Sequence, residues 1–143
     1  MASDTPRPLA RFRGHPVHTV LAPIPFVCFL GTLITDIAYA VTADMQWANF
    51  AAWLLTAGLL VSVLVVIAGV IDLLGVRRRR GSGATWIHSL GDAVALALAV
   101  IDAFVHTRDA YTSVVPEGLA LSFLVVLVLL AVGWFDRGLE VRP

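Results

Sequence analysis

The stretch HSLGDAVALALAVIDAFVH, residues 88–106, places four ionisable side chains in an otherwise apolar run that is long enough for a membrane helix. At the 100° per residue of an α-helix, these side chains fall within a stripe about 80° wide. They are His88, Asp92, Asp102 and His106. Because ionisable groups rarely face lipid, the stripe must face a protein interior, which the rest of the chain would enclose.

The composition is that of an integral membrane protein. The chain has 143 residues, of which 59% are hydrophobic and only 14% are charged. A soluble domain of this size needs more charge to cover its surface. The length suits one domain, and a single cysteine, Cys28, excludes a disulfide within the chain.

Four apolar runs predict four membrane-spanning helices, at residues 20–41, 50–74, 86–105 and 119–135. Each run is near the ~20 residues that cross a bilayer. Pro23 and Pro25 predict a broken or kinked beginning of the first span. A cleavable signal peptide is the alternative for this run, because arginines precede it and an Ala-Tyr-Ala triplet follows, although the run is long for a signal core.

The arginines predict how the bundle is oriented. Nine of the ten basic residues lie on one side of a four-span protein, and only Arg108 lies on the other. Because positively charged loops stay in the cytoplasm, both termini should be cytoplasmic. We expect a cytoplasmic leader at residues 1–14, an all-α, four-helix transmembrane domain at 15–136 and a cytoplasmic tail at 137–143. Arg77–Arg80 is interpreted as a determinant of this topology, and no nucleic-acid partner is expected.

Helix rise and topology place the polar groups in two layers. The inner, cytoplasmic-side layer holds His15 and His18 before the first span, Asp72 in the second, and His88 and Asp92 in the third. Imidazoles with carboxylate neighbours are typical of a haem or transition-metal site, in which the acid orients the ring. His18 and His88 are the first-choice ligands, followed by His15 and Asp72. Asp92 would orient His88.

The outer layer lies roughly 27 Å away, the rise of the helix from His88 to His106. It holds Asp36, Asp102, His106 and Arg108. A charged Asp deep in a bilayer costs at least ~2.5–3.5 kcal/mol, so these acids must be paired, protonated or in contact with water. Asp102 can pair with His106 one turn away, or with Arg108. The group is interpreted either as a proton relay or as a clamp that ties helices together.

The second and fourth spans differ in their small and polar residues. The second carries Gly58, Ser62, Gly69 and Asp72 on one side, a track of small residues that lets another helix approach closely. The fourth has Ser122 as its interior polar group and is interpreted as a packing wall without chemistry.

The run Gly14-His15-Pro16-Val17-His18, followed by Pro25-Phe26, resembles a bacterial four-span membrane family catalogued as domain of unknown function twenty-two thirty-one. The family pattern continues with an Asp in the first span, a Gly-x-x-Asp ending the second and a His early in the third. Here these positions correspond to Asp36, Gly69–Asp72 and His88. The resemblance runs from Arg13 to about Arg108 and implies a multi-pass protein of the bacterial cytoplasmic (inner) membrane. Some family members are fused to iron–sulfur domains, which implies electron transfer.

Three functions follow from these patterns. The leading hypothesis is a bundle that binds haem b or a transition metal at the inner layer and exchanges an electron with a quinone or a partner protein. The second is a protein that handles protons or ions through the Asp/His stripe. The third is a non-catalytic subunit of a larger membrane complex, whose polar groups only lock helices together. The expected partners also include the lipid bilayer and a second copy of the chain, and enzyme activity is left open.

Overall fold

The computed structural model describes the backbone of residues 11–12, 15–16, 20–75, 83–108 and 114–140, and the side chains of residues 20–71, 89–108 and 114–135. Its elements in chain order are β1 (Arg11–Phe12), β2 (His15–Pro16), α2 (Pro23–Thr42), α3 (Met45–Gly75), α4 (Gly83–His106) and α5 (Glu117–Glu140). The described helices confirm the all-helical, four-span prediction. The strands β1 and β2 form only a two-residue antiparallel pairing.

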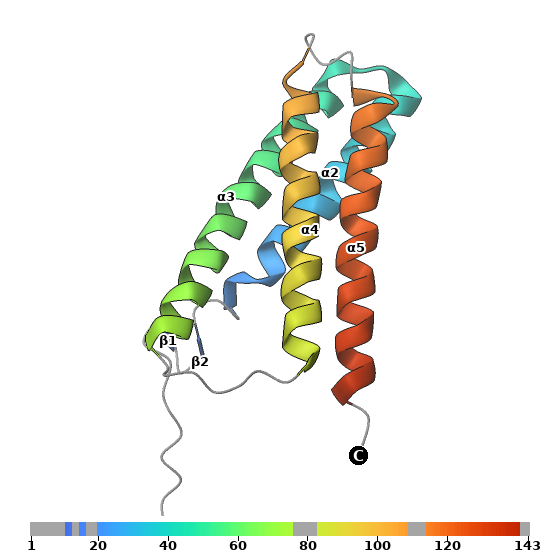
Figure 1. Cartoon of the computed structure of the whole chain (residues 1–143). Helices are drawn as coiled ribbons and strands as arrows, with labels where there is room; N and C mark the ends of the chain where they lie inside the picture. Colours follow the sequence, from blue (N-terminus) through green and yellow to red (C-terminus); the bar gives the residue numbers. More distant parts are fainter. Residues whose placement is uncertain (1–10, 13–14, 17–19, 76–82, 109–113, 141–143) are drawn as a thin grey trace, which may run out of the picture.

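The helices stand side by side, and α3 leans away from α4 toward the end of the bundle where β1, β2 and the end of α5 lie (Figure 1). We name this the terminal end, and the opposite end, where α2 ends and α5 begins, the loop end. α2 packs mainly on α3 and also on α5, whereas α4 packs mainly on α5 and less on α3. An even number of spans explains why both described ends of the chain lie together.

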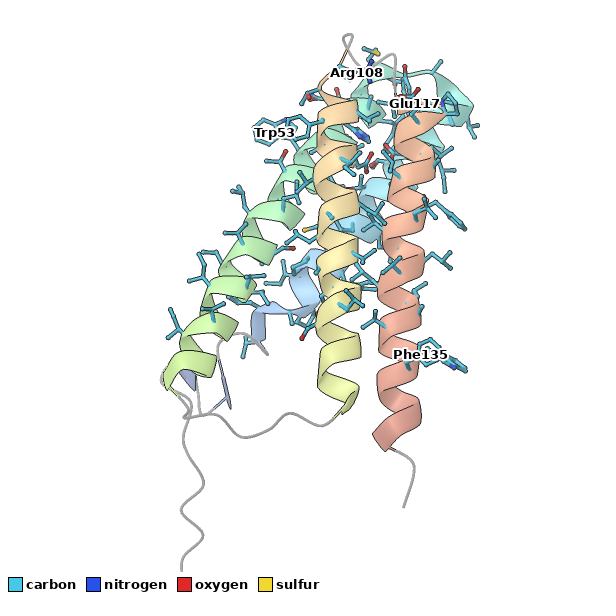
Figure 2. All side chains as sticks on the ribbon, in the orientation of Figure 1. Trp53, Arg108, Glu117 and Phe135 are labelled. Carbon is cyan, nitrogen blue, oxygen red and sulfur yellow. The ribbon has the colours of Figure 1, made fainter. Side chains whose placement is uncertain are left out.

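The outside of the bundle is a surface for lipid. All four helices are long and apolar enough to cross a membrane. Trp53 and Phe135 point away from the bundle (Figure 2) and are 69% and 64% exposed. Large apolar side chains are also exposed along every helix, which water would penalise and a bilayer accepts. The chain is therefore a multi-pass membrane protein.

The two prolines stand at the beginning of α2. Residues 20 and 21 are helical, Ala22 forms a turn, and α2 begins at Pro23. A proline in the first turn of a helix removes an N–H group that has no helical partner there. The break predicted for the first span thus lies before α2, which continues without interruption to Thr42. α2 packs into the bundle as an integral span.

A short connection joins α2 to α3. The residue after α2, Ala43, has a left-handed backbone (φ 52°), and its N–H donates to the carbonyl of Tyr39 at 2.8 Å. Asp44 Oδ1 then accepts the N–H of Gln46 at 2.9 Å, which caps the beginning of α3. This connection fixes α2 and α3 as antiparallel neighbours.

An apolar layer closes the middle of the bundle. Phe29, Leu55, Ala99 and Val125 form it, and each comes from a different helix. Gly58 lets α2 and α3 approach, because a Cβ there would lie 2.8 Å from Phe29 Cε1. This is the close approach that the track of small residues predicts. At Gly69 a Cβ would meet nothing within 4 Å, so the approach does not extend that far along α3.

Candidate functional site

The polar stripe on α4 faces the core over the second half of the helix. Ala95, Ala99, Asp102 and His106 are all buried, as the helical periodicity predicts. Asp92, one turn before Ala95, is exposed. The stripe is therefore internal from Ala95 to the end of α4 at the loop end.

The buried face of α2 is polar at the same level. Asp36 is fully buried, and Thr32 and Thr35 lie on the same face. The hydroxyl of Thr32 donates to the carbonyl of Cys28 at 3.1 Å, and that of Thr35 donates to the carbonyls of Gly31 and Thr32, both at 2.9 Å. Both threonines thus satisfy their donors within α2, and neither donates a proton to Asp36.

His106 joins the acids of two helices. Its Nε2 atom lies 2.9 Å from Asp36 Oδ1. Its Nδ1 atom lies 3.0 Å from the backbone carbonyl oxygen of Asp102 and also 3.0 Å from Asp102 Oδ1. The helical i, i+4 spacing produces the contact with Asp102, whereas the contact with Asp36 ties α4 to α2. We name Asp36, Asp102 and His106 the acid–histidine cluster.

The hydrogen bonds determine where the protons of the cluster lie. A carbonyl oxygen only accepts, so Nδ1 carries a proton and donates it to the backbone of Asp102. The contact between Nε2 and Asp36 then needs one proton, carried either by an imidazolium that donates to the carboxylate or by a carboxylic acid that donates to the ring. Both arrangements leave the Asp36–His106 pair with no net charge.

The carboxyl group of Asp102 lacks a hydrogen-bond donor. Among the described residues, neither of its carboxyl oxygens nor Asp36 Oδ2 has a hydrogen-bond partner, although all three are buried. The Nδ1–H group of His106 is close to Asp102 Oδ1 but is directed at the backbone carbonyl. A bare carboxylate in such a place costs several kcal/mol. Asp102 therefore needs one positive charge, either its own proton or a bound cation.

The first turn of α5 lies directly against His106. A Cβ on Gly118 would lie 2.9 Å from His106 Cε1 and 3.6 Å from Asp102 Oδ1, so a glycine is needed for this approach. The amino end of a helix carries a partial positive charge. That charge lowers the electrostatic cost of burying acids beside it.

A narrow seam leads from Asp102 toward the apolar layer. It is lined by Phe29, Thr32, Leu55, Asp102, Ser122 and Val125, and it has no room for a water molecule. The hydroxyl of Ser122 is buried and donates to the carbonyl of Leu119 at 3.2 Å. The apolar layer lies on the terminal-end side of the seam, so the shorter way from the cluster to water leads to the loop end.

The structure brings together three of the four residues predicted for the outer layer. Asp36, Asp102 and His106 are in contact, and of the two pairings open to Asp102 the structure has the one with His106. The side chain of Arg108 is exposed and lies at the loop end (Figure 2). It takes no part in the cluster.

The predicted inner layer lies mostly outside the described residues. This holds for the side chains of His15, His18, Asp72 and His88, whereas Asp92 is described and exposed. Within the described part of the chain, no group of three or more His, Cys, Asp and Glu side chains is arranged to hold a metal ion. Both ring nitrogens of His106 are engaged in hydrogen bonds, which leaves no lone pair on the ring for a metal.

The sequence does not predict that Thr32, Gly118 and Ser122 lie beside the cluster. The sequence predicts Ser122 to belong to a packing wall, but in the structure the buried Ser122 lines the seam beside Asp102. Thr32 carried a usable signal, because it lies four residues before Asp36 and so shares its helix face. No sequence signal points to Gly118, because its contact with His106 depends on how α5 packs on α4.

A family model matches residues 14–141 of the chain, and the family is described as "Predicted membrane protein (DUF2231)". This match confirms the family resemblance and agrees with the four apolar helices. No curated protein and no solved structure matches the chain.

Proposed function

The chain belongs to the family of predicted membrane proteins DUF2231, and on this premise we propose that it handles protons at its acid–histidine cluster. The observation that carries the proposal is one buried imidazole within hydrogen-bond distance of two fully buried acids. Histidine is the side chain whose protonation normally changes near neutral pH. Ionisable groups inside membrane bundles are typical of proton and ion pathways.

A role as a helix clamp alone explains the cluster less well. Buried ion pairs can often be replaced by apolar residues of similar volume with no loss of stability. A clamp between α2 and α4 needs only Asp36 and His106, whereas the carboxyl oxygens of Asp102 have no hydrogen-bond partner among the described residues. A group that gains and loses a proton needs such an acid, because the proton itself is the missing partner.

The position of the cluster suggests which solution it exchanges protons with. His106 is the last residue of α4, and Gly118 is in the first turn of α5, so the loop end is near. The apolar layer separates the cluster from the terminal end. With both termini cytoplasmic, as the arginines predict, the cluster would face the outer side of a bacterial inner membrane. Transport across that membrane would require the apolar layer to open.

Proton flux into vesicles tests the proposal. Purified protein is reconstituted into liposomes that contain a pH-sensitive dye, and the external pH is lowered in one step. We expect protein-dependent acidification that is lost in Asp102→Asn, a substitution that keeps the size but removes the exchangeable proton. Asp44→Asn is the matched control, because Asp44 is exposed and caps α3 and asparagine caps a helix equally well.

The proposal fails if both Asp36→Asn and Asp102→Asn conduct protons as the unsubstituted protein does. Each variant is first compared with the unsubstituted protein by its helical content and by its elution from a sizing column in detergent. A variant that elutes as an aggregate is excluded from the comparison.

A haem b or transition-metal site near the terminal end is the second candidate. It is favoured by the position of β2, which contains His15, at the same end of the bundle as the beginning of α4, which contains His88 (Figure 1). His18 and His88 would be the first ligands, and the electron would pass to a quinone or a partner protein.

The visible spectrum and metal content of the detergent-purified protein test this candidate. A Soret band or stoichiometric metal that is lost in His88→Ala supports it, and the absence of both in the unsubstituted protein overturns it. The mass of the same sample in detergent tests whether two copies of the chain associate.

A further inference from the structure

The bundle consists of two helical hairpins that are linked by a contact between two buried side chains. α2 packs most extensively on α3, and α4 on α5, whereas the packing between these two hairpins is less extensive. Among the described residues, α2 and α4 lie diagonally across the bundle, because the main neighbours of each are α3 and α5. The 2.9 Å contact between Asp36 Oδ1 and His106 Nε2 crosses this diagonal. It therefore ties the α2–α3 hairpin to the α4–α5 hairpin at the loop end.

The two hairpins pack less closely toward the terminal end. α3 leans away from α4 there (Figure 1), and a Cβ on Gly69 of α3 would meet nothing within 4 Å. Asp92 of α4 is exposed, although it shares a helix face with the buried Ala95. Because α3 and α4 meet over only part of their length, the hairpins can turn relative to each other about the apolar layer.

The link between the hairpins depends on one proton. Nδ1 of His106 donates to the backbone carbonyl of Asp102, so the contact between Nε2 and Asp36 Oδ1 needs a proton of its own. Without that proton, a nitrogen lone pair would face a carboxylate oxygen, and neither group could donate. The buried carboxylate of Asp36 would also lack a counter-charge, which favours its exposure to water. Loss of the proton therefore replaces an attraction between the hairpins by a repulsion.

Among the described residues, few other ionisable groups act on the link. The titratable groups that act on His106 are Asp36 of α2 and Asp102 of its own helix. The residue of α5 that lies against the ring, Gly118, does not titrate, and Glu117 beside it is exposed. The buried residues nearest the beginning of α3 are alanines. The shared proton is therefore the one whose loss changes the contact between the hairpins.

We propose that the Asp36–His106 contact is a proton-operated latch between the two hairpins. With the proton in place, the hairpins are held together at the loop end. When the N–H or O–H bond of this proton breaks, the proton passes to water at the loop end and Asp36 keeps one negative charge. The hairpins then separate at that end, which hydrates the carboxylate. The closed form dominates at low pH and the open form at high pH. This inference rests on the proposed proton handling and adds that the same proton regulates the access of water to the cluster.

Distances between spin labels on the full chain in liposomes test the latch. In a Cys28→Ser background, the labels are attached at Asp44→Cys, between α2 and α3, and at Glu117→Cys, at the beginning of α5, because both side chains are exposed at the loop end. Pulsed electron paramagnetic resonance measures their separation from about pH 5 to about pH 10, a range that includes the ordinary titration of histidine. A longer distance should appear as the pH rises. Its population relative to the short distance should increase about tenfold per pH unit, because one proton is lost.

Substitutions separate the latch from other effects of pH. Asp36→Asn should keep the short distance at high pH, because the amide N–H donates to Nε2 of His106 and does not titrate. Asp102→Asn should still show the change in distance, since it leaves both atoms of the link in place. A label pair within one hairpin, Leu90→Cys with Glu117→Cys, is the matched control. Leu90 is exposed on α4, and the distance of this pair should not depend on pH.

Two results would overturn the latch. One is a distance between the loop-end labels that stays constant over the whole pH range, which needs no substitution in the cluster. The other is the same pH dependence in Asp36→Asn. Proton flux measured with unlabelled protein separates the two proposals. Flux together with a constant distance removes only the latch, whereas a pH-dependent distance without flux removes the proposed conduction of protons but not the latch.

Discussion

His106 forms hydrogen bonds with two different partners through the two nitrogen atoms of its ring. Nδ1 donates to the backbone carbonyl of Asp102, while Nε2 shares a proton with Asp36 across the helix interface. An amide side chain presents its donor and its acceptor at nearly the same point, so it cannot reach both partners. The ring therefore holds the two helices at one register and at the same time keeps a proton between them.

Replacing His106 by alanine should destabilise the bundle. We expect His106→Ala to lower the free energy of unfolding by about 3–5 kcal/mol, because the buried Asp36 loses the ring with which it shares a proton. Unfolding in detergent by a chemical denaturant measures it. Thr107→Ala is the control, since the neighbouring Thr107 is exposed and should change stability by less than ~0.5 kcal/mol. Equal stability of both variants would show that the cluster does not hold the helices together.

Replacing the whole cluster by apolar residues should separate stability from function. We expect the triple variant Asp36→Val, Asp102→Val and His106→Leu to be more stable than His106→Ala alone, because no buried charge remains without a partner. The same variant should show no proton flux in liposomes. Flux equal to that of the unsubstituted protein would assign proton handling to another part of the chain.

At the scale of helices, the cluster forms where the end of α4 and the beginning of α5 lie beside a residue within α2. α4 ends at His106, α5 begins at Glu117, and α2 passes beside both with Asp36. The first turn of α5 can pack against the imidazole because Gly118 has no side chain. The position of one glycine thus decides how closely the positive end of a helix approaches two acids.

A methyl group at Gly118 should push α5 away from the cluster. We expect Gly118→Ala to lower the free energy of unfolding by about 1–3 kcal/mol, because its Cβ would collide with a buried ring that has no room to move. Gly69→Ala in α3 is the matched control, since a Cβ there meets nothing within 4 Å. Alanine is the better helix former, so the control should be neutral or more stable by up to ~1 kcal/mol. The reverse order of the two variants would contradict the packing described for α5.

The whole molecule is asymmetric along the membrane normal. The described ends of the chain lie at the terminal end (Figure 1), the acid–histidine cluster lies near the loop end, and the apolar layer separates the two. If the cluster exchanges protons as proposed, it would therefore do so with only one of the two solutions. The orientation of the bundle decides whether that solution is the cytoplasm or the outside.

Labelling with a thiol reagent that does not cross membranes tests this orientation. Cys28 is the only cysteine, so a Cys28→Ser background accepts single new cysteines. With both termini cytoplasmic, Asp44→Cys between α2 and α3 should react in intact cells, whereas Ser82→Cys should react only after lysis. The opposite pattern would place the cluster on the cytoplasmic side.

Much of the fold follows from the sequence by itself, because it depends on local properties. The length and hydropathy of the apolar runs predict the four spans, and their even number places both ends of the chain on one side. The 3.6-residue period predicts that Ala95, Ala99, Asp102 and His106 share the buried face of α4. The sequence also predicts that Asp102 can pair with His106, because the two residues lie one turn apart on the same helix. It leaves Arg108 as the alternative partner.

The tertiary structure alone decided which groups from different helices meet. The prolines before and within the first turn of α2 make its phase unpredictable, so the 2.9 Å contact between Asp36 and His106 could not be derived from spacing. The approach of Gly118 and the place of Ser122 beside Asp102 depend likewise on how α5 docks. Periodicity determines the faces of one helix, whereas the distance between faces of different helices is set by the packing of all of them together.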